Sequence, residues 1–275
     1  AAGHPLPLDY PAGSSIEDPT GLIGHIGFGL VYAVWAGWLI HRGYLLKGRE
    51  RILCWFLAAI SFGMIFLAQG RSGYLVAVAV LLAASWKIWL HRTSRQTVAA
   101  VVLASLAISS IALLGPARER LSSTVSSIHS VIQGDIAHAE ERVSLWYLAW
   151  KGIRSHPWFG LGTGGYSTYA KKQADSDPRI HLNIAPGHPH QIYLAAWTRW
   201  GPVGLLLVLA LFWTWIRRGS QASWHANDAS LVLLSALALA VHGLSAPSLD
   251  EYFASIYAVL WLGLGLGAMH QEEVQ

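Results

Sequence analysis

The stretch Gly187-His188-Pro189-His190-Gln191-Ile192-Tyr193-Leu194 places two histidines directly in front of a long apolar run, residues 203–216. An apolar run of this kind is typical of a helix that crosses a membrane. A titratable imidazole at the mouth of such a helix is costly unless it is paired or used in function. The stretch therefore predicts a functional site at one end of a membrane-spanning helix.

The composition of the 275-residue chain is that of a membrane protein. Hydrophobic residues make up 53% of it and charged residues only 12%, against about 25% charged in ordinary soluble domains. Fourteen tryptophans and ten tyrosines suit the aromatic belts of two membrane interfaces. The net charge of +4 comes without a basic run, so we expect no nucleic-acid partner. Cys54 is the only cysteine, which excludes an intrachain disulfide.

Seven apolar segments are long enough, or nearly so, for the roughly 20 residues of a membrane-crossing helix. They are residues 21–40, 52–68, 73–90, 97–114, 191–216, 229–246 and 252–269. We therefore predict an all-α fold, a polytopic transmembrane helix bundle with a large, partly helical periplasmic loop. Residues 1–114 would hold an outer N-terminal segment and four spans, 115–187 the loop, and 188–275 three spans and a short cytoplasmic tail. Because the chain starts at Ala1 without an initiator methionine, we expect earlier spans to precede it.

The charges of the loops predict the orientation. The connections 41–51, 87–95 and 217–218 are basic, and the short connections on the opposite side hold few basic residues. The positive-inside rule makes the basic side cytoplasmic. Six polar residues then fall near the outer face, namely His25, Arg71, Arg142, His190, His242 and Asp250. This asymmetry predicts one site that opens outward.

The long loop 115–187 is expected to contain a helix over residues 140–155. Apolar residues recur there at helical spacing, and Pro157 ends the pattern. The tryptophan-rich side of this helix lies along the membrane surface or packs onto the bundle, and the pattern leaves both open. Residues 122–127 are interpreted as flexible loop. Residues 160–165 match the letters of G-x-G-x-x-G, but no strand precedes them, so we expect a turn rather than a dinucleotide site.

An ordered series of motifs resembles one family of membrane enzymes. The series is Arg71-Ser72-Gly73-Tyr74, Arg142, His156-Pro157-Trp158-Phe159-Gly160-Leu161-Gly162, Pro189-His190-Gln191-Ile192-Tyr193-Leu194 and Gly201-Pro202-Val203-Gly204-Leu205. In this order and spacing, over about residues 21–269, the chain resembles the O-antigen ligase family of bacterial membrane glycosyltransferases. The resemblance implies transfer of a glycan from undecaprenyl pyrophosphate to an acceptor such as the lipid A core. It implies that this happens at the periplasmic face of the inner membrane, without a metal, nucleotide or other cofactor.

The resemblance also implies roles for three residues. The family's histidine, in a His-Asn-x-x-Leu pattern, matches His190, and its two important arginines match Arg71 and Arg142. A neutral imidazole suits the base that takes the proton of the attacking hydroxyl, and nearby arginines keep it neutral. Guanidinium groups bind the oxygens of a departing pyrophosphate bidentately. Gln191 stands where the family has Asn, which leaves a ligase, a polymerase and a protein O-oligosaccharyltransferase all open.

Five further residues are candidates for lining the substrate site, namely His25, His188, Tyr193, His242 and Asp250. Asp250 would orient His190 or hold an arginine. His188 and His181 lack a third ligand of suitable spacing, so we predict no metal site.

Arg199 is left out of the predicted site. It follows His190 by nine residues, which is about 180° of rotation on one continuous helix, so it would face away. Gly201-Pro202 is a possible kink that would alter this geometry.

A transporter or flippase for a lipid-linked sugar is the alternative from another functional class. Transporters commonly have internal repeats and broken helices near the bilayer midplane. The chain has no clear internal repeat, and its polar residues lie near one face. The pattern therefore favours an enzyme.

Overall fold

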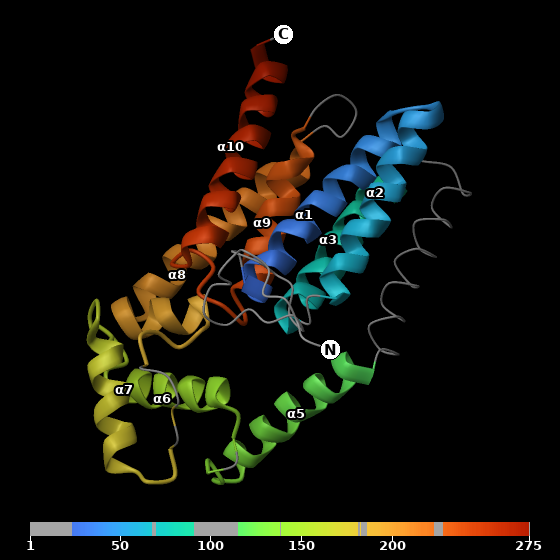
Figure 1. The fold of residues 1–275 in the computed structure, drawn as a ribbon. Helices are drawn as coiled ribbons and strands as arrows, with labels where there is room; N and C mark the ends of the chain where they lie inside the picture. The colour runs from blue at the N-terminus through green and yellow to red at the C-terminus, as the bar shows by residue number, and fades with distance from the viewer. Residues whose placement is uncertain are drawn as a thin grey trace, which may run out of the picture.

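The computed structural model describes residues 24–67, 70–90, 115–137, 139–180, 182, 186–222 and 228–274. Within these ranges all regular structure is helical, which confirms the all-α prediction for the described part of the chain. The predicted span 97–114 lies outside the described residues. Six helices of the described chain form a bundle, and three others form a separate layer at one end of it (Figure 1).

The bundle is built around α9 (Ser230–His242). This helix is apolar on all sides, and such a helix is stable only where neighbours cover it completely. It packs against α1 (Gly24–Leu45), α3 (Arg71–Leu90), α8 (Ile192–Gln221) and α10 (Tyr252–Val274), while α2 (Gly48–Leu67) packs on α1 and α3. Almost every side chain of α9 is buried as a result. α9 is therefore the central helix of the bundle, and its contacts fix the positions of the helices around it.

The residues between α3 and α8 form the second layer. It consists of α5 (Gly115–Ile132), α6 (Glu141–Ser155) and α7 (Gly165–Ser176). The predicted helix 140–155 is confirmed as α6, whose buried residues include Leu148, Ala149 and Ile153 and which packs against α5, α7 and α8. The helix is therefore packed onto its neighbours along its apolar side.

The interpretation of residues 122–127 as flexible loop is wrong. They lie inside α5, where Ser126 Oγ donates to the carbonyl of Ser123 and Ser130 Oγ to that of Ser126. Serines commonly favour loops because their hydroxyls compete for backbone groups, but here the hydroxyls bond back within the helix. Ser123 Oγ also donates to Glu140 Oε1 at 2.7 Å, which ties α5 to the start of α6.

A joint between two segments bends α8. The helix is interrupted at Trp200 and Gly201, where Gly201 has φ +66° and ψ −159°, and Pro202 has no N–H to give to the carbonyl of Thr198. The N–H of Leu161 donates to that carbonyl at 2.6 Å, and the N–H of Gly162 donates to the carbonyl of Arg199 at 3.1 Å. Segment 156–162 thus satisfies the backbone groups that the kink releases. Two of the motifs noted in the sequence are the two sides of this joint.

The letters G-x-G-x-x-G at residues 160–165 have their explanation in the same joint. Gly160 and Gly162 both have positive φ, and a Cβ on Gly160 would come within 2.6 Å of the Thr198 carbonyl oxygen. No strand precedes the segment in the described chain, which fits the expected turn. These glycines let one backbone approach another.

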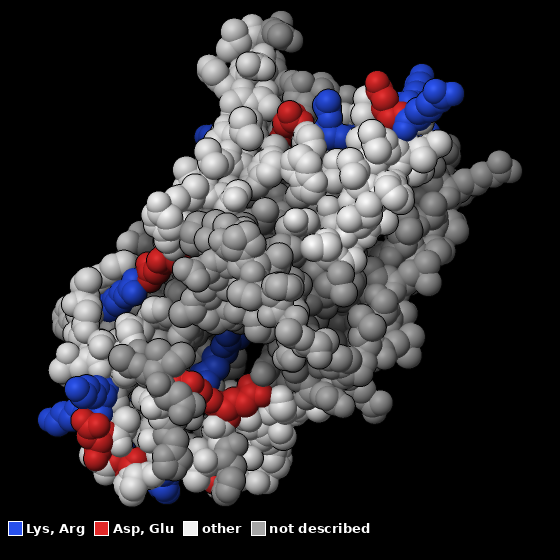
Figure 2. All heavy atoms as spheres, viewed as in Figure 1, with Lys and Arg blue, Asp and Glu red and all other residues white. Residues whose placement is uncertain are grey.

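The bundle surface is strongly apolar. Large hydrophobic side chains are exposed on α2, α8 and α10, among them Ile52, Phe56, Val203, Leu207, Val259 and Leu264. Figure 2 shows that the described charged groups on the visible face gather toward the two ends of the molecule, and that other described residues, drawn in white, lie between them. Among the described residues, only α8 is long and apolar enough by itself to cross a bilayer, and α3 and α9 contain shorter apolar stretches. The seven-span arrangement stays a prediction.

Polar contacts tie the helices together at the end that carries the α1–α2 turn. Lys87 is buried, and its Nζ donates to the carbonyls of Ser220 and Ala222 at the C-terminus of α8. His41 Nδ1 and Ser230 Oγ lie 2.8 Å apart between α1 and α9. Cationic groups at a helix C-terminus satisfy its last carbonyls. This end is therefore a structural anchor, and the candidate site lies at the other end.

Candidate functional site

The candidate site lies at the end of the bundle where α3 and α8 begin and where the chain turns from α9 to α10 (Figure 1). α6 packs against α8 there and contributes its first turn. Figure 2 shows charged groups of both signs around a hollow at this end. Segments that are far apart in sequence thus contribute to one region.

His190 lies just before α8 in an unusual backbone conformation. Its φ is +50°, and it is the only non-glycine residue with positive φ in the described chain. Such a conformation is uncommon for a residue with a Cβ and occurs often at functional sites. α8 begins two residues later, and Gln191 caps it by accepting the N–H of Leu194 on Oε1 at 2.8 Å. Gln191 is therefore the N-cap residue of α8, and Asn is also common at this position.

His188 and His190 are in direct contact. Their ring centroids lie 4.2 Å apart with the rings inclined at 64°, and the backbone N–H of His190 donates to Nδ1 of His188 at 3.2 Å. Both side chains are partly buried. Together they form the centre of the site.

The electrostatic environment keeps His190 neutral. Burial, followed by the charges of His188 and Arg142, lowers the pKa of His190 to about 4, and Glu141 acts weakly in the opposite direction. Arg142, in the first turn of α6, therefore lies close enough to His190 to act on its charge. At neutral pH the imidazole has a free lone pair and can accept a proton.

A second group of charges joins α8 to the turn after α9. Arg199 Nη1 and Asp250 Oδ2 form an ion pair at 2.6 Å. Burial lowers the pKa of His188, Asp250 raises it and Arg199 lowers it, so this ion pair lies beside His188. Burial also raises the pKa of Glu251, and the charge of Arg142 opposes that shift. Two arginines and three carboxylates thus surround the pair of histidines.

The prediction that Arg199 faces away from the site is wrong. It assumed one continuous helix from His190, whereas α8 begins only at Ile192 and His190 precedes it with φ +50°. Asp250, which we expected to orient His190 or to hold an arginine, holds Arg199. The Gly201-Pro202 pair follows Arg199 in the chain, so the kink there is not the reason for the difference.

Glu251 was missed by the sequence analysis. Its Oε2 is buried and has no hydrogen-bond partner among the protein atoms of the described chain. Buried carboxylate oxygens are nearly always bonded, so an unbonded one indicates a place for a ligand or water group that donates. The signal in the sequence was an acidic pair, Asp250-Glu251, in a short turn between two apolar segments.

Two predicted lining residues make contacts inside the bundle instead. Tyr193 donates its hydroxyl to the carbonyl of Ala240 at 2.6 Å and packs edge-on against Phe212, 6.1 Å between ring centroids. His242 is fully buried, and its Nδ1 lies 3.0 Å from Ser248 Oγ. These contacts join α8 to α9 and α9 to the following turn.

The side chains of His25 and Arg71 lie outside the described residues, so their predicted roles rest on sequence alone. Their backbones are described: His25 is the second residue of α1, and Arg71 is the first residue of α3. No group of three or more metal-ligating side chains lies together in the described part of the chain.

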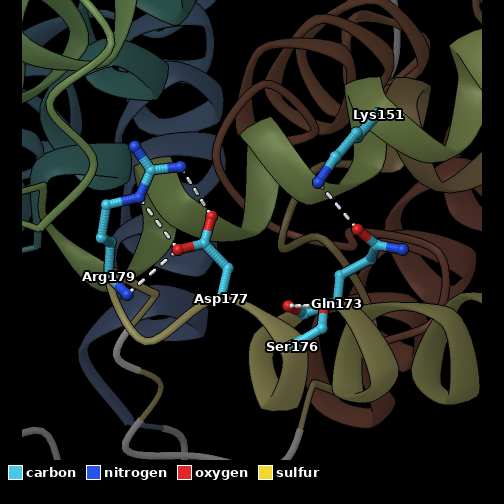
Figure 3. A network of polar contacts seen from close by, with 5 residues as sticks. All are labelled: Lys151, Gln173, Ser176, Asp177 and Arg179. Carbon is cyan, nitrogen blue, oxygen red and sulfur yellow. Dashed lines mark hydrogen bonds and ion pairs between the residues drawn. The ribbon is translucent and has the colours of Figure 1, made fainter.

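A polar network connects α6 to the segment that leads toward the histidines (Figure 3). Lys151 Nζ donates to Gln173 Oε1 at 2.7 Å. Arg179 donates from Nε and Nη2 to the two oxygens of Asp177 at 2.9 and 2.8 Å, which lowers the pKa of Asp177 to about 2. The network orders the end of α7 and the turn that follows it.

The chain is similar to one protein family and to a relative of known description. The family described as O-antigen ligase matches residues 56–209, more than half of the chain and including both sides of the α8 joint, Arg142 and both histidines. A general O-oligosaccharyltransferase of Acinetobacter baylyi is 26% identical over 164 residues, which is 58% of this chain and 28% of that protein. The present chain thus spans less than a third of its relative's length.

Proposed function

Because the chain belongs to the O-antigen ligase family, we propose that it is a membrane glycosyltransferase that moves a glycan from undecaprenyl pyrophosphate to an acceptor hydroxyl. The reaction takes place at the periplasmic face of the bacterial inner membrane. The observation that carries the proposal is the position of His190: it lies before α8 with φ +50°, contacts His188, and is close enough to Arg142 for that cation to lower its pKa. A base and a cation at one place are what attack by a hydroxyl and departure of a diphosphate require.

In the proposed reaction the acceptor hydroxyl gives its proton to His190 as its oxygen attacks the anomeric carbon. A new C–O bond forms on one face of the sugar while the bond to the phosphate oxygen breaks on the opposite face. The anomeric configuration is therefore inverted, and undecaprenyl pyrophosphate leaves as an anion. Arg142 and Arg71 stabilise the charge that develops on it, because a guanidinium stays charged and binds phosphate oxygens in pairs. Bound metal has no part in this scheme.

Glu251 supports a substrate that is rich in hydroxyl groups. Its unbonded Oε2 accepts a hydrogen bond from such a group without displacing an existing contact. A buried acceptor left without a donor is unfavourable by about 1–3 kcal/mol, and a bound sugar would remove that cost. We place the sugar end of a substrate beside this residue.

Three classes of acceptor require separate assays. The family description favours an acceptor on lipopolysaccharide, such as the lipid A core. The similarity to an O-oligosaccharyltransferase favours a hydroxyl on a protein as the second candidate. A polymerase would instead use the growing glycan that is still on the carrier lipid.

The decisive experiment uses the full-length protein, purified in detergent, with a glycan on undecaprenyl pyrophosphate. The three acceptors are lipid A core, a serine-containing acceptor protein and a second molecule of the lipid-linked glycan. We expect glycan on one of these acceptors with an inverted anomeric centre, read by mass spectrometry and NMR. Absence of transfer to all three acceptors would reject the proposal. Transfer in detergent would exclude a purely transporting role, since no sealed compartment is present.

The proposed role of Arg142 predicts a specific kinetic defect. Arg142→Ala should lower kcat/KM for the lipid-linked donor by about 10²–10³-fold, the usual loss when one charge-stabilising donor is removed. Arg142→Lys should restore part of it, because an ammonium keeps the charge but not the paired geometry. Arg154→Ala is the matched control, since Arg154 is an exposed arginine in the last turn of the same helix. An Arg142→Ala variant with wild-type donor kinetics would remove Arg142 from the mechanism.

The environment of His190 predicts the pH dependence. Its pKa is lowered to about 4. The imidazole is therefore neutral, and able to accept a proton, at pH values well below the ordinary histidine pKa of about 6.5. The acid limb of kcat/KM, which reports the free enzyme, should therefore lie below pH 6.5. The acid limb of kcat should lie at higher pH, because a bound diphosphate offsets the charge of Arg142 and raises the pKa of His190. Identical limbs near pH 6.5 in both profiles would contradict this account.

A further inference from the structure

His188 makes a contact that the proposed chemistry does not use. Its Nδ1 accepts the backbone N–H of His190, the residue with φ +50°. A non-glycine residue keeps such a conformation only where the surrounding structure holds it. The Pro189 between the two histidines has a constrained φ and no side-chain acceptor for that N–H.

We propose that His188 is the positioning residue of this site: its unprotonated Nδ1 holds the backbone of His190 in the left-handed conformation that directs the catalytic imidazole toward the acceptor hydroxyl. The inference rests on the proposed function, because it gives His190 the role of base. His188 itself touches no reacting atom. It acts through the backbone of its neighbour.

The contact requires one protonation state and one tautomer of His188. A nitrogen that accepts a hydrogen bond must carry a lone pair, so the ring is neutral and its single proton is on Nε2. Partial burial favours the neutral ring, and it lowers the pKa of His188. The ion pair of Arg199 and Asp250 lies beside the ring with both signs of charge, so it adds little net charge that would protonate the ring.

The position of that ion pair depends on the joint in α8. Arg199 directly precedes the interruption at Trp200 and Gly201, and its carbonyl accepts the N–H of Gly162. The joint therefore sets where Arg199 meets Asp250 at 2.6 Å. The line of contacts runs from segment 156–162 through Arg199 and Asp250 to His188 and on to His190. It connects the kink at Trp200 and Gly201 to the two histidines.

The first test measures the tautomer without any turnover. ¹⁵N-histidine NMR of the full-length protein in detergent at pH 7.5, with the His188→Asn variant to assign the signal, should show His188 neutral and protonated on Nε2. A charged ring, or a ring protonated on Nδ1, would overturn the proposal. This result stands whether or not the protein transfers a glycan.

The second test uses three variants that separate the two ring nitrogens. His188→Asn keeps an acceptor near the position of Nδ1, His188→Gln keeps a polar group near the position of Nε2, and His188→Ala removes both. We expect kcat within about threefold of wild type for His188→Asn and lower by about tenfold or more for the other two. The donor KM should change little, because Arg142 is untouched. Melting temperatures of all three identify any variant that simply fails to fold.

The outcomes of the kinetic test separate the positioning role of His188 from the proposed function of the protein. Equal activity of His188→Gln and His188→Asn, or wild-type kcat in His188→Ala, would overturn the positioning role while leaving the proposed function in place. Absence of transfer by the wild-type protein would reject the proposed function, and the NMR result would still decide how His188 holds the backbone. A rise in donor KM with unchanged kcat would mean that His188 binds substrate and would also overturn the inference.

Discussion

His190→Ala should lose glycan transfer almost completely, with kcat lower by about 10²–10⁴-fold, because general-base catalysis contributes about that much. In free energy this is roughly 3–5 kcal/mol of transition-state stabilisation. The imidazole is neutral, partly buried and close to the cation of Arg142. Donor binding should survive, because the methyl group of alanine leaves Arg142 in place.

The control for this variant is His270→Ala. His270 is an exposed histidine near the end of α10, outside the histidine pair and the joint. We expect wild-type transfer from it. Transfer by both variants at the wild-type rate, measured with the same purified donor and acceptor, would eliminate His190 as the base.

Gly201→Ala should be the most destabilising single substitution of those considered. Gly201 has φ +66° and ψ −159°, a combination that is essentially restricted to glycine and costs other residues about 1–3 kcal/mol. A Cβ there would lie 2.0 Å from the carbonyl oxygen of Trp158, a backbone atom that cannot rotate away. Overpacking of a tight contact costs about 1–3 kcal/mol more. Against a total stability of about 5–15 kcal/mol, we expect a large fall in melting temperature.

Alanine substitutions at two other glycines separate the effect of the backbone conformation from the effect of the close contact. Gly164 has φ +81° with nothing within 4 Å of a Cβ, so Gly164→Ala tests the backbone conformation alone. Gly267, in α10, has neither a positive φ nor a close neighbour, so Gly267→Ala tests neither. The melting temperatures should fall in the order Gly267→Ala, Gly164→Ala, Gly201→Ala. A Gly201→Ala protein as stable as Gly267→Ala would show that the joint is not a tight contact.

The joint also has a consequence for activity. A partly folded Gly201→Ala protein should lose transfer by more than its lost stability explains, because the joint positions Arg199 against Asp250 beside His188. Asp250→Asn keeps the shape of the side chain and weakens only the ion pair. It should therefore reproduce part of the loss in kcat without the loss in melting temperature.

The local patterns of the sequence predicted most of the helices in the described chain. The apolar spacing in 140–155 and the stop at Pro157 predicted α6 to within one residue at its start, because a helix that covers a core on one side must repeat its apolar residues every three to four positions. The apolar segments around α3, α8, α9 and α10 predicted helices for the same reason. The serine-rich residues 122–127 misled, because serine hydroxyls bond to the backbone in loops and in helices alike.

The family and the identity of the central histidine also follow from the sequence by itself, since the ordered motifs depend on residue types and their order. The tertiary structure alone decided how those residues meet. It placed Arg199 in an ion pair with Asp250 beside His188, because His190 lies outside α8. It also showed that Glu251 has a buried oxygen without a hydrogen-bond partner among the described residues. The conformation of His190 likewise depends on a hydrogen bond to a side chain. Contacts between distant segments, and the burial that shifts a pKa, are properties of packing, and no spacing along the chain encodes them directly.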